Sequence, residues 1–362
     1  MRIAIFLYFL FIKVTLSQEA PSDDVKKIEK KWDFDTYSKP KRKDYYKKNP
    51  MNQPESEFTV EEKFSSEPTP IFLSPFAPEK QEMFIDPDIE NMFLGNAGTK
   101  IIFPPNCFIL PSNYRKGEPI TIQVQEALSS LDFITAGVSL SYYDSNKKPY
   151  LFESSGMFRL SANFYGKPVY KKRDCRIKAE FPVSSSNLKG VNLYKLEERG
   201  WTDKGQANYD EINVPRDSPE YLKMLTGVIP NVDSFTWWNF DKPNPDTTCL
   251  QGAISAGEGV KSPFTITITG IDFKYASTQN ANGNDFKINA LQSKLVKLIA
   301  MDSRGNIGVS REIKTDSSYA FINSQNYKST SCQDIGKIEI KKIEPSIRQD
   351  KQKLINFLGL KD

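Results

Sequence analysis

Four cysteines are the side chains of this 362-residue chain best suited to chemistry. A cysteine can attack an electrophile, bind a metal ion or join a second cysteine in a disulfide. A catalytic thiol usually needs a basic partner such as histidine, and zinc sites usually use C-x-x-C spacing or histidine. The chain has no histidine and no C-x-x-C pair. We therefore interpret the four residues as disulfide partners: Cys107, Cys175, Cys249 and Cys332.

The absence of histidine also lowers the expectation of an enzyme. Histidine is the side chain most often used for proton transfer near neutral pH, and it is the commonest metal ligand. Carboxylate pairs, lysine and tyrosine could still do chemistry. We predict that the protein is not an enzyme and has no catalytic residue, metal site or cofactor.

The charge is nearly balanced, with 49 Lys and Arg against 45 Asp and Glu and a net charge of +4. Nucleic-acid-binding proteins concentrate basic residues on one patch or stripe. Nothing in this composition resembles such a concentration, and we predict no nucleic-acid partner.

The first residues, MRIAIFLYFLFIKVTLSQEAPSDD, have the pattern of a secretory signal peptide. Arg2 precedes an apolar run from Ile3 to Ile12, and the small residues Thr15 and Ser17 follow it. A transmembrane helix needs about 20 apolar residues, and this run is shorter. We predict a signal peptide at residues 1–17 and an exported mature protein, either soluble or peripherally attached to a membrane. Export favours disulfides, because oxidising compartments preserve them.

Residues 18–80 are rich in Lys, Glu, Asp, Ser and Pro and show no sustained hydrophobic period up to about residue 70. Such a composition buries too little apolar surface to offset the entropy of ordering. We predict an extended, disordered tether. Its aromatic residues leave two interpretations open, a solvated linker or a segment that folds onto a partner or onto its own domain. The candidate binding residues are Trp32, Tyr45 and Tyr46.

Beyond the tether, short runs of alternating apolar residues separated by turn formers predict β-strands. Examples are ITIQVQEA, MFRLSANFY and VNLYKLEE. This spacing is typical of a sandwich or barrel, and it predicts a first domain over residues 81–243. DSPEYLKMLTGVIP, which opens on Asp217, is the best helical candidate in this region.

The segment DKPNPDTTC interrupts the pattern, and further β runs with glycine turns predict a second domain over residues 246–343. Residues 344–362 are predicted to form a short amphipathic C-terminal helix or tail that packs on the second domain or on a partner. The fold class is therefore all-β: two β-sandwich domains in tandem, with a disordered N-terminal tether and a short C-terminal helix. Four cysteines allow three pairings, and this division favours Cys107 with Cys175 and Cys249 with Cys332.

The first domain resembles the ZU5-like β-sandwich of exported proteins of the Bacteroidota. The resemblance rests on GTKIIFPPNCFI, GEPITIQVQEA, LFESSGMFRLSA and WWNFDKP. Cys107 occupies the position of the usual alanine, and Thr236 that of the glycine before the tryptophans. The second domain is similar to a carboxypeptidase-regulatory-like module of transthyretin type, through CLQGAISAG, FTITITGIDF, NANGNDFKINA and SCQDIGKIEI. Both resemblances imply accessory or adhesive sandwiches rather than enzymes, and such folds carry many functions.

The segment DSFTWWNFD suggests two more specific hypotheses. Some ZU5-containing proteins cleave themselves at a His-Phe-Ser triplet, but Ser234-Phe235-Thr236 lacks the activating histidine. Trp237 and Trp238 could instead stack on a glycan, because aromatic faces offer a large contact area. The competing interpretation is one tryptophan in the core and one sheltered by a loop.

Two acidic or amide-rich runs contain oxygen ligands of the kind that calcium prefers. Neither completes a calcium-binding loop, and an Asn-Gly pair is a strong hairpin signal. We therefore predict turns at both runs, and also at DSRGN (residues 302–306). The residues concerned are Asp86, Asp88 and Glu90 in the first run and Asn282, Asn284 and Asp285 in the second.

The sequence patterns predict an exported, non-catalytic protein. The resemblances imply a scaffold or adhesion protein of a bacterial cell envelope, in the periplasm or at the cell surface, whose expected partners are other envelope proteins in an outer-membrane, secretion or gliding assembly. Two alternatives stay open. A glycan-binding module should show an exposed aromatic platform, and a carboxylate hydrolase should show two Asp or Glu side chains facing each other across a pocket.

Overall fold

The structure, a computed structural model, describes residues 71–361 except 147, 184–188, 199, 212–224, 261 and 324. The predicted signal peptide and most of the predicted tether, including Trp32, Tyr45 and Tyr46, lie outside the described residues. All described residues belong to one compact unit. Within them, no helix combines the length and the apolar character needed to cross a bilayer.

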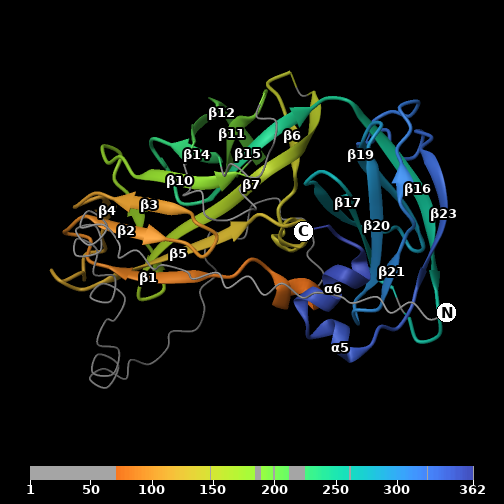
Figure 1. The fold of residues 1–362 in the computed structure, drawn as a ribbon, viewed down its shortest axis with the longest axis horizontal. Coiled ribbons are helices and arrows are strands. Elements are labelled where there is room, and N and C mark those ends of the chain that lie inside the picture. Colours follow the sequence, from red (N-terminus) through yellow and green to blue (C-terminus); the bar gives the residue numbers. More distant parts are fainter. Residues whose placement is uncertain are drawn as a thin grey trace, which may run out of the picture. The chain divides into compact units, whose positions relative to one another are not determined.

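The fold is almost entirely β, as the sequence predicts, and its sheets fall into two pairs (Figure 1). The first pair consists of an eight-stranded sheet and a five-stranded sheet. The eight-stranded sheet has the order β1 (Gln81–Ile85), β5 (Ile120–Ala127), β7 (Pro149–Phe164), β15 (Trp237–Asn244), β11 (Asn192–Glu197) and β12 (Gly200–Gln206), with β6 (Ser141–Tyr143) and β8 (Lys167–Pro168) also paired to β7. The five-stranded sheet has the order β13 (Asn208–Glu211), β14 (Leu225–Ile229), β10 (Lys178–Val183), β3 (Lys100–Phe103) and β2 (Asn91–Leu94).

A core of alternate apolar side chains lies between these two sheets. Strand β5 shows this alternation: Ile120, Ile122 and Val124 are fully buried, and the residues between them are half-buried. The rings of Phe181 and Phe240 stack with centroids 6.0 Å apart. Gly156 faces the same core with φ of 141°, and a Cβ there would lie 2.6 Å from the Phe181 ring. Glycine is therefore required at this position by both backbone and packing.

The second pair of sheets contains the strands after residue 246. One sheet has the order β19 (Asp285–Leu291), β16 (Thr247–Ala256) and β23 (Gln333–Ile340), in which β16 and β23 run parallel. The other has the order β18 (Ala276–Asn280), β17 (Phe264–Gly270), β20 (Leu295–Asp302) and β21 (Ile307–Val309), with β22 (Ile313–Lys314) also paired to β20. A separate two-stranded ladder joins β4 (Phe108–Ile109) to β9 (Tyr170–Lys171).

The two pairs of sheets share a second hydrophobic core. This core contains Phe152 and Trp237 from the eight-stranded sheet together with Ile268 and Leu298 from the second pair. Polar contacts also join them, including a 2.9 Å ion pair between Lys294 Nζ and Glu153 Oε2. The sheets therefore pack as one unit, although within the described residues no strand of one pair of sheets pairs with a strand of the other.

Four short helices complete the described residues: η2 (Ile71–Phe76, a 3-10 helix), α4 (Ser130–Thr135), α5 (Pro345–Arg348) and α6 (Lys351–Leu358). The predicted C-terminal helix is present as α5 and α6. It packs within the chain, because Leu354 and Leu358 are fully buried in the shared core.

Two local predictions need correction. The sequence predicts that residues 71–80 belong to the tether, but η2 buries Leu73 and Phe76 in the shared core, because this end of the segment is apolar. The helix predicted from Asp217 is wrong at its C-terminal end, where Leu225–Ile229 form β14 between two partner strands. Pairing on both sides supplies backbone hydrogen bonds that override local propensity. The rest of that segment lies outside the described residues.

The three predicted turns are turns. Asn282 and Asp285 exchange backbone hydrogen bonds of 2.8 and 3.2 Å around Gly283, which has φ of 66°. Asp302 Oδ1 accepts from the backbone N–H of Arg304 and of Asn306 between β20 and β21. Asp86 Oδ1 similarly accepts from the backbone N–H of Asp88. These side chains cap turns, as short polar residues commonly do.

Candidate functional site: a disulfide-anchored loop beside a polar pocket

All four cysteines form disulfides, in the pairing that the sequence favours. Cys107 joins Cys175 with 5.3 Å between Cα atoms, and Cys249 joins Cys332 with 5.0 Å. Each bridge stays within one pair of sheets and spans 68 or 83 residues of sequence. Two disulfides indicate an oxidising compartment, either extracellular or periplasmic.

The first disulfide fastens a peripheral ladder of the first pair of sheets. Cys107 immediately precedes β4, and its carbonyl accepts a 2.8 Å hydrogen bond from the backbone N–H of Lys172, just after β9. Cys175 is three residues further along the chain. The bridge therefore reinforces a two-residue ladder whose backbone pairing is short, and we assign it a structural role.

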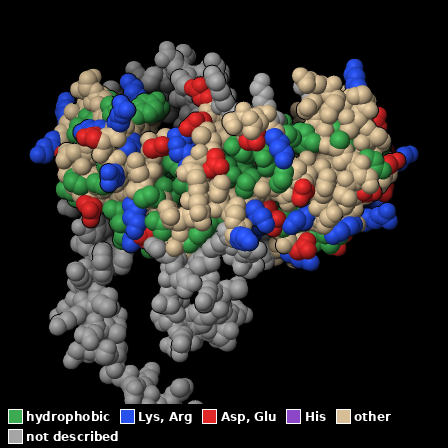
Figure 2. All heavy atoms as spheres, turned by 90° about the horizontal axis from the view of Figure 1, so that it is seen from above, with side chains coloured by type: hydrophobic (Ala, Val, Ile, Leu, Met, Phe, Trp, Pro, Cys, Tyr) green, Lys and Arg blue, Asp and Glu red, His purple; other side chains and the backbone are tan. Residues whose placement is uncertain are grey.

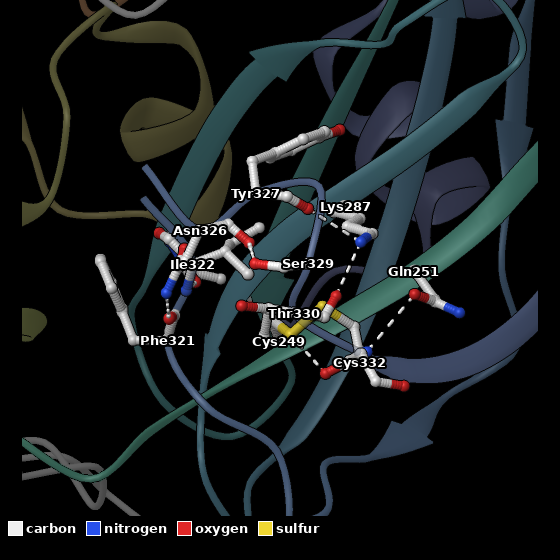
Figure 3. The surroundings of a disulfide bond; sticks show 12 residues. Cys249, Gln251, Lys287, Phe321, Ile322, Asn326, Tyr327, Ser329, Thr330 and Cys332 are labelled. Carbon is white, nitrogen blue, oxygen red and sulfur yellow. Dashed lines mark hydrogen bonds between the residues drawn. A yellow bond between two sulfur atoms is a disulfide. The ribbon is translucent and has the colours of Figure 1, made fainter. Parts of the chain in front are cut away.

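The second disulfide anchors a long loop on the second pair of sheets. We call residues 315–332, between β22 and β23, the anchored loop; all but residue 324 are described. Its last residue, Cys332, is joined to Cys249 on β16 (Figure 3). Loops of more than about 12 to 15 residues without regular structure are commonly functional.

Side chains of the underlying sheet hold the anchored loop at several further points. Asn289 on β19 donates from Nδ2 to the carbonyl of Ile322 at 2.8 Å, and its Oδ1 accepts from the Ile322 N–H at 2.9 Å. Lys287 Nζ donates to the carbonyls of Tyr327 at 2.9 Å and Thr330 at 2.7 Å (Figure 3). Lys287 and Asn289, two alternate residues of β19, therefore hold the loop backbone through their side chains instead of through strand pairing.

Lys287 also lies under the ring of Tyr327, with Nζ 5.6 Å from the ring centroid. Such a contact is favourable, because the face of an aromatic ring attracts a cation. At the end of the loop, the Cys332 N–H donates to Gln251 Oε1 on β16 at 3.3 Å (Figure 3). The same side chains that fix the loop therefore fix the orientation of Tyr327.

An open pocket of about 570 Å³ lies beside the loop. Tyr327 and Lys328 of the loop form one side, and residues of β16, the β18–β19 turn and β23 form the rest. The lining combines the rings of Tyr327 and Phe286 with amides, carboxylates and ammonium groups: Gln251, Asn282, Asp285, Lys287, Asp334 and Lys337. This arrangement can accept a polar ligand that hydrogen-bonds at its edge and packs against a ring.

Asp285 and Asp334 both line this pocket, and Asp334 Oδ1 accepts a 2.9 Å hydrogen bond from the Gly336 N–H. Across the part of the chain that the structure describes, no group of three or more Cys, Asp or Glu side chains is arranged to hold a metal ion.

Trp237 and Trp238 lie elsewhere, on β15, and both are buried. Trp238 is 1% exposed in the core between the first two sheets, and Trp237 is 7% exposed in the shared core on the opposite face. These two side chains therefore do not form the exposed aromatic platform that the glycan interpretation requires, and both are sheltered, as the competing interpretation predicts. The reason is that Trp237 lies in the hydrophobic core that the eight-stranded sheet shares with the second pair of sheets, so alternation along β15 leads from one core to another.

A polar cluster is also buried on β15. Asn239 donates from Nδ2 to Asp241 Oδ2 and accepts at Oδ1 from Ser154 Oγ at 3.0 Å. Asp241 is fully buried, and its Oδ1 has no hydrogen-bond partner. Burial raises the pKa of this carboxyl well above its usual range. Removed from solvent, the cluster has no substrate access, and we assign it to the core.

Sequence reasoning identified the disulfide and missed the polar residues around it. Tyr327 and Lys328 belong to none of the motifs, and Gln251 lies within CLQGAISAG without a role assigned to it. Their positions in the pocket depend on how the loop folds back over β16 and β19. The available signal was the combination of a long Asn- and Ser-rich segment, SSYAFINSQNYKSTSC, with a cysteine at its end. No known protein family, curated protein or solved structure matches this chain.

Proposed function

We propose that this protein is an exported, non-catalytic binding protein that serves as a scaffold or adhesion component of a bacterial cell envelope, and that the anchored loop and its pocket bind its partner. The observation that carries the proposal is the anchored loop itself: a long surface loop fixed at Cys332 by a disulfide and at three other residues by side chains of the sheet. The resemblance to ZU5-like and transthyretin-type sandwiches supports the same role.

Two physical arguments favour binding at this loop. Binding residues are concentrated on loops that a rigid scaffold positions. A loop held in one conformation before binding loses less conformational entropy when a partner docks, so more of the contact energy appears as affinity. The disulfide and the Lys287 and Asn289 hydrogen bonds give the loop this property.

The proposal is tested by crosslinking affinity isolation of the tagged protein from its native envelope. Wild type is compared with the double variant Tyr327→Ala, Lys328→Glu, and with the control Lys167→Glu on β8, at an exposed position of the first pair of sheets. We expect the same specific partners with wild type and control, and at least a tenfold loss with the loop variant. Equal recovery with all three proteins would contradict a role for the loop.

A glycan is a second candidate ligand, because Tyr327 combines an aromatic face with neighbouring amide and carboxylate groups in the pocket. Titration of the purified protein with envelope glycan fragments, followed by calorimetry, separates the two. Binding that requires Tyr327 and persists in the absence of other proteins would favour the glycan.

Activity assays address the remaining alternative, a hydrolase that uses Asp285 and Asp334. We expect no turnover of glycoside, peptide or ester substrates by wild type. Turnover that disappears in Asp285→Asn or Asp334→Asn would overturn the non-catalytic assignment.

A further inference from the structure

A groove of about 750 Å³ separates the edges of the second pair of sheets. We call it the edge groove. Strand β21 forms one wall, strand β23 the other, and the segment from Lys341 through α5 and α6 closes the end. Among the described strands, each of the two has a strand partner on one side only, β20 for β21 and β16 for β23. Both walls are therefore sheet edges (Figure 1).

The two edges touch at one end and then separate. Ile307 and Lys341 exchange two backbone hydrogen bonds of 3.1 Å, in an isolated antiparallel bridge. Within the described residues, β21 and β23 share no other backbone hydrogen bond. At Gly308 they are still close, because a Cβ there would lie 2.5 Å from the Glu339 carbonyl oxygen. The groove opens beyond that point.

The alternation of backbone groups along a strand shows which ones face the groove. Lys341 directs its N–H and C=O toward β21, whereas the Ile340 carbonyl accepts from Gly257 on the β16 side. The register from Lys337 to Ile340 is continuous. Glu339 and Lys337 therefore direct their N–H and C=O groups into the groove, as Val309 does from the opposite wall. A sheet edge of this kind is a template for an added strand.

The floor of the groove is apolar. Val309, Ile335 and Ile347 are half-buried there, and Phe357 of α6 is 39% exposed although its helix neighbours Leu354 and Leu358 are fully buried. An added strand would direct every second side chain onto this floor. Apolar residues at alternate positions would therefore suit it.

The rim of the groove is mainly basic. Four basic side chains line it, against two acidic ones, Glu339 and Glu344. Glu339 is already paired with Lys341 at 2.9 Å. The excess positive charge favours acidic residues in the occupant. The basic residues are Arg311, Lys337, Lys341 and Lys342. Figure 2, by comparison, shows a face on which basic and acidic side chains are interspersed.

We propose that the edge groove binds an extended segment of a partner protein, with apolar side chains at alternate positions and acidic side chains between them, which pairs with the free edge of β23. Main-chain hydrogen bonds would supply affinity, and the floor and rim would supply specificity. This inference deepens the proposed function and rests on it only in that the protein works by binding. The edge groove and the pocket beside the anchored loop share Lys337 as a lining residue and no other.

The test uses a fluorescein-labelled eight-residue peptide of alternating Val and Glu, and the purified mature protein, in fluorescence anisotropy. A control peptide has the same composition with four Val followed by four Glu, which cannot present one apolar face as a strand. We expect saturable binding of the alternating peptide, at least tenfold tighter than that of the control.

A matched pair of variants separates backbone pairing from charge. Lys337→Gln removes the ammonium group alone, and Lys337→Pro removes the backbone N–H as well, at an edge position where proline is tolerated. We expect a modest loss with Lys337→Gln and a further loss of at least fivefold with Lys337→Pro, at unchanged thermal stability. Phe357→Ser, at an exposed position, is an independent variant of the floor and should weaken binding at least threefold.

Equal affinity of Lys337→Pro and Lys337→Gln, or no binding by wild type, would overturn the proposal. Binding that appears only after residues 18–64 are removed would show that this segment of the chain itself fills the groove. Concentration-dependent dimerisation that Lys337→Pro abolishes would show that a second copy of the chain fills it. Either result would also overturn the proposal. The double variant Tyr327→Ala, Lys328→Glu should retain peptide binding. Lys337 also lines the pocket beside the anchored loop, whereas Phe357→Ser and the Tyr327→Ala, Lys328→Glu double variant each change one surface alone. These two variants therefore distinguish failure of this test from failure of the proposed function.

Discussion

Lys351 of α6 and Asp132 of α4 form an ion pair with 3.1 Å between Nζ and Oδ1, although 219 residues separate them in the sequence. Asp132 also completes the capping box of α4 with Ser129. The C-terminal helix is therefore tied to a helix that follows β5 in the first pair of sheets. This contact, together with the shared core, makes the last residues part of the fold.

Burial of α6 predicts that Leu354→Ala will be strongly destabilising. Leu354 is fully buried in the shared core, and truncation of such a leucine costs about 2 to 5 kcal/mol. Lys351→Ala should cost about 1 kcal/mol or less, because the Lys351 side chain is half exposed. Urea unfolding measures both, with Gln352→Ala at an exposed position of α6 as the control. Similar stabilities for all three variants would contradict the docking of α6.

Much of the fold follows from local pattern, and the failures have a common cause. Strand β5 coincides with the run ITIQVQEA, because alternation is strong where one face is buried. Helix α4 was missed although Ser129 and Asp132 carry a capping signature, since six residues are too few to show a helical period. Strand β14 was mistaken for part of a helix, because its two partner strands, not its own residues, decide its conformation.

The candidate sites depend on the tertiary arrangement still more. The Cys249–Cys332 bridge could be anticipated from the order of the cysteines. The pocket beside Tyr327 could not, because it forms where the anchored loop, β16 and β23 meet. The edge groove likewise depends on the distance between two sheet edges, which no sequence pattern encodes.

Removal of the second disulfide should destabilise the protein and release the anchored loop. In the entropic treatment, a bridge that closes 83 residues stabilises by about 4.5 kcal/mol. The double variant Cys249→Ser, Cys332→Ser should therefore unfold at lower denaturant, and its residues 315–332 should lose hydrogen-exchange protection selectively. Protection equal to that of wild type would show that the Lys287 and Asn289 hydrogen bonds are sufficient.

Both disulfides should be found in the native protein by non-reducing peptide mapping. We expect two linkages, Cys107–Cys175 and Cys249–Cys332, and no free thiol. Recovery of a peptide that joins Cys107 to Cys249 or Cys332 would contradict the arrangement of the sheets. Four free thiols would contradict the oxidising compartment.

A partly buried lysine predicts a specific loss of stability in acid. Lys195 donates to Glu197 at 2.7 Å and to Asp233 at 3.1 Å. The hydrogen bond from Lys195 lowers the pKa of Glu197. Burial tends to raise the pKa of Asp233, but the hydrogen bond and the charge of Lys195 outweigh burial, and this pKa is lowered too. Carboxyls with lowered pKa values stabilise the fold above their unfolded pKa of about 4, and that contribution is lost as pH falls through the folded values.

Lys195→Met should therefore destabilise the protein most at neutral pH, and the difference from wild type should shrink as pH falls from about 6 to 3. Denaturant midpoints across this range measure the effect. Lys167→Met, at an exposed position of β8, is the control and should leave a constant difference. A difference for Lys195→Met that does not change with pH would mean that its packing, not its charge, matters.

The buried Asp241 predicts the opposite pH dependence. Burial raises the pKa of this carboxyl well above its unfolded value, so the native state holds a proton that the unfolded state releases above about pH 4. Stability is then fully retained below the unfolded pKa and falls as pH rises toward the folded pKa, by up to about 1.4 kcal/mol per pH unit.

Asp241→Asn keeps the shape of the side chain and can still accept the hydrogen bond from Asn239 Nδ2 at its amide oxygen. We expect the variant to be more stable than wild type at pH 7, with the advantage growing between pH 4 and 7 in denaturant unfolding. An advantage that is constant with pH, or a variant that is less stable throughout, would show that Asp241 is ionised in the folded protein.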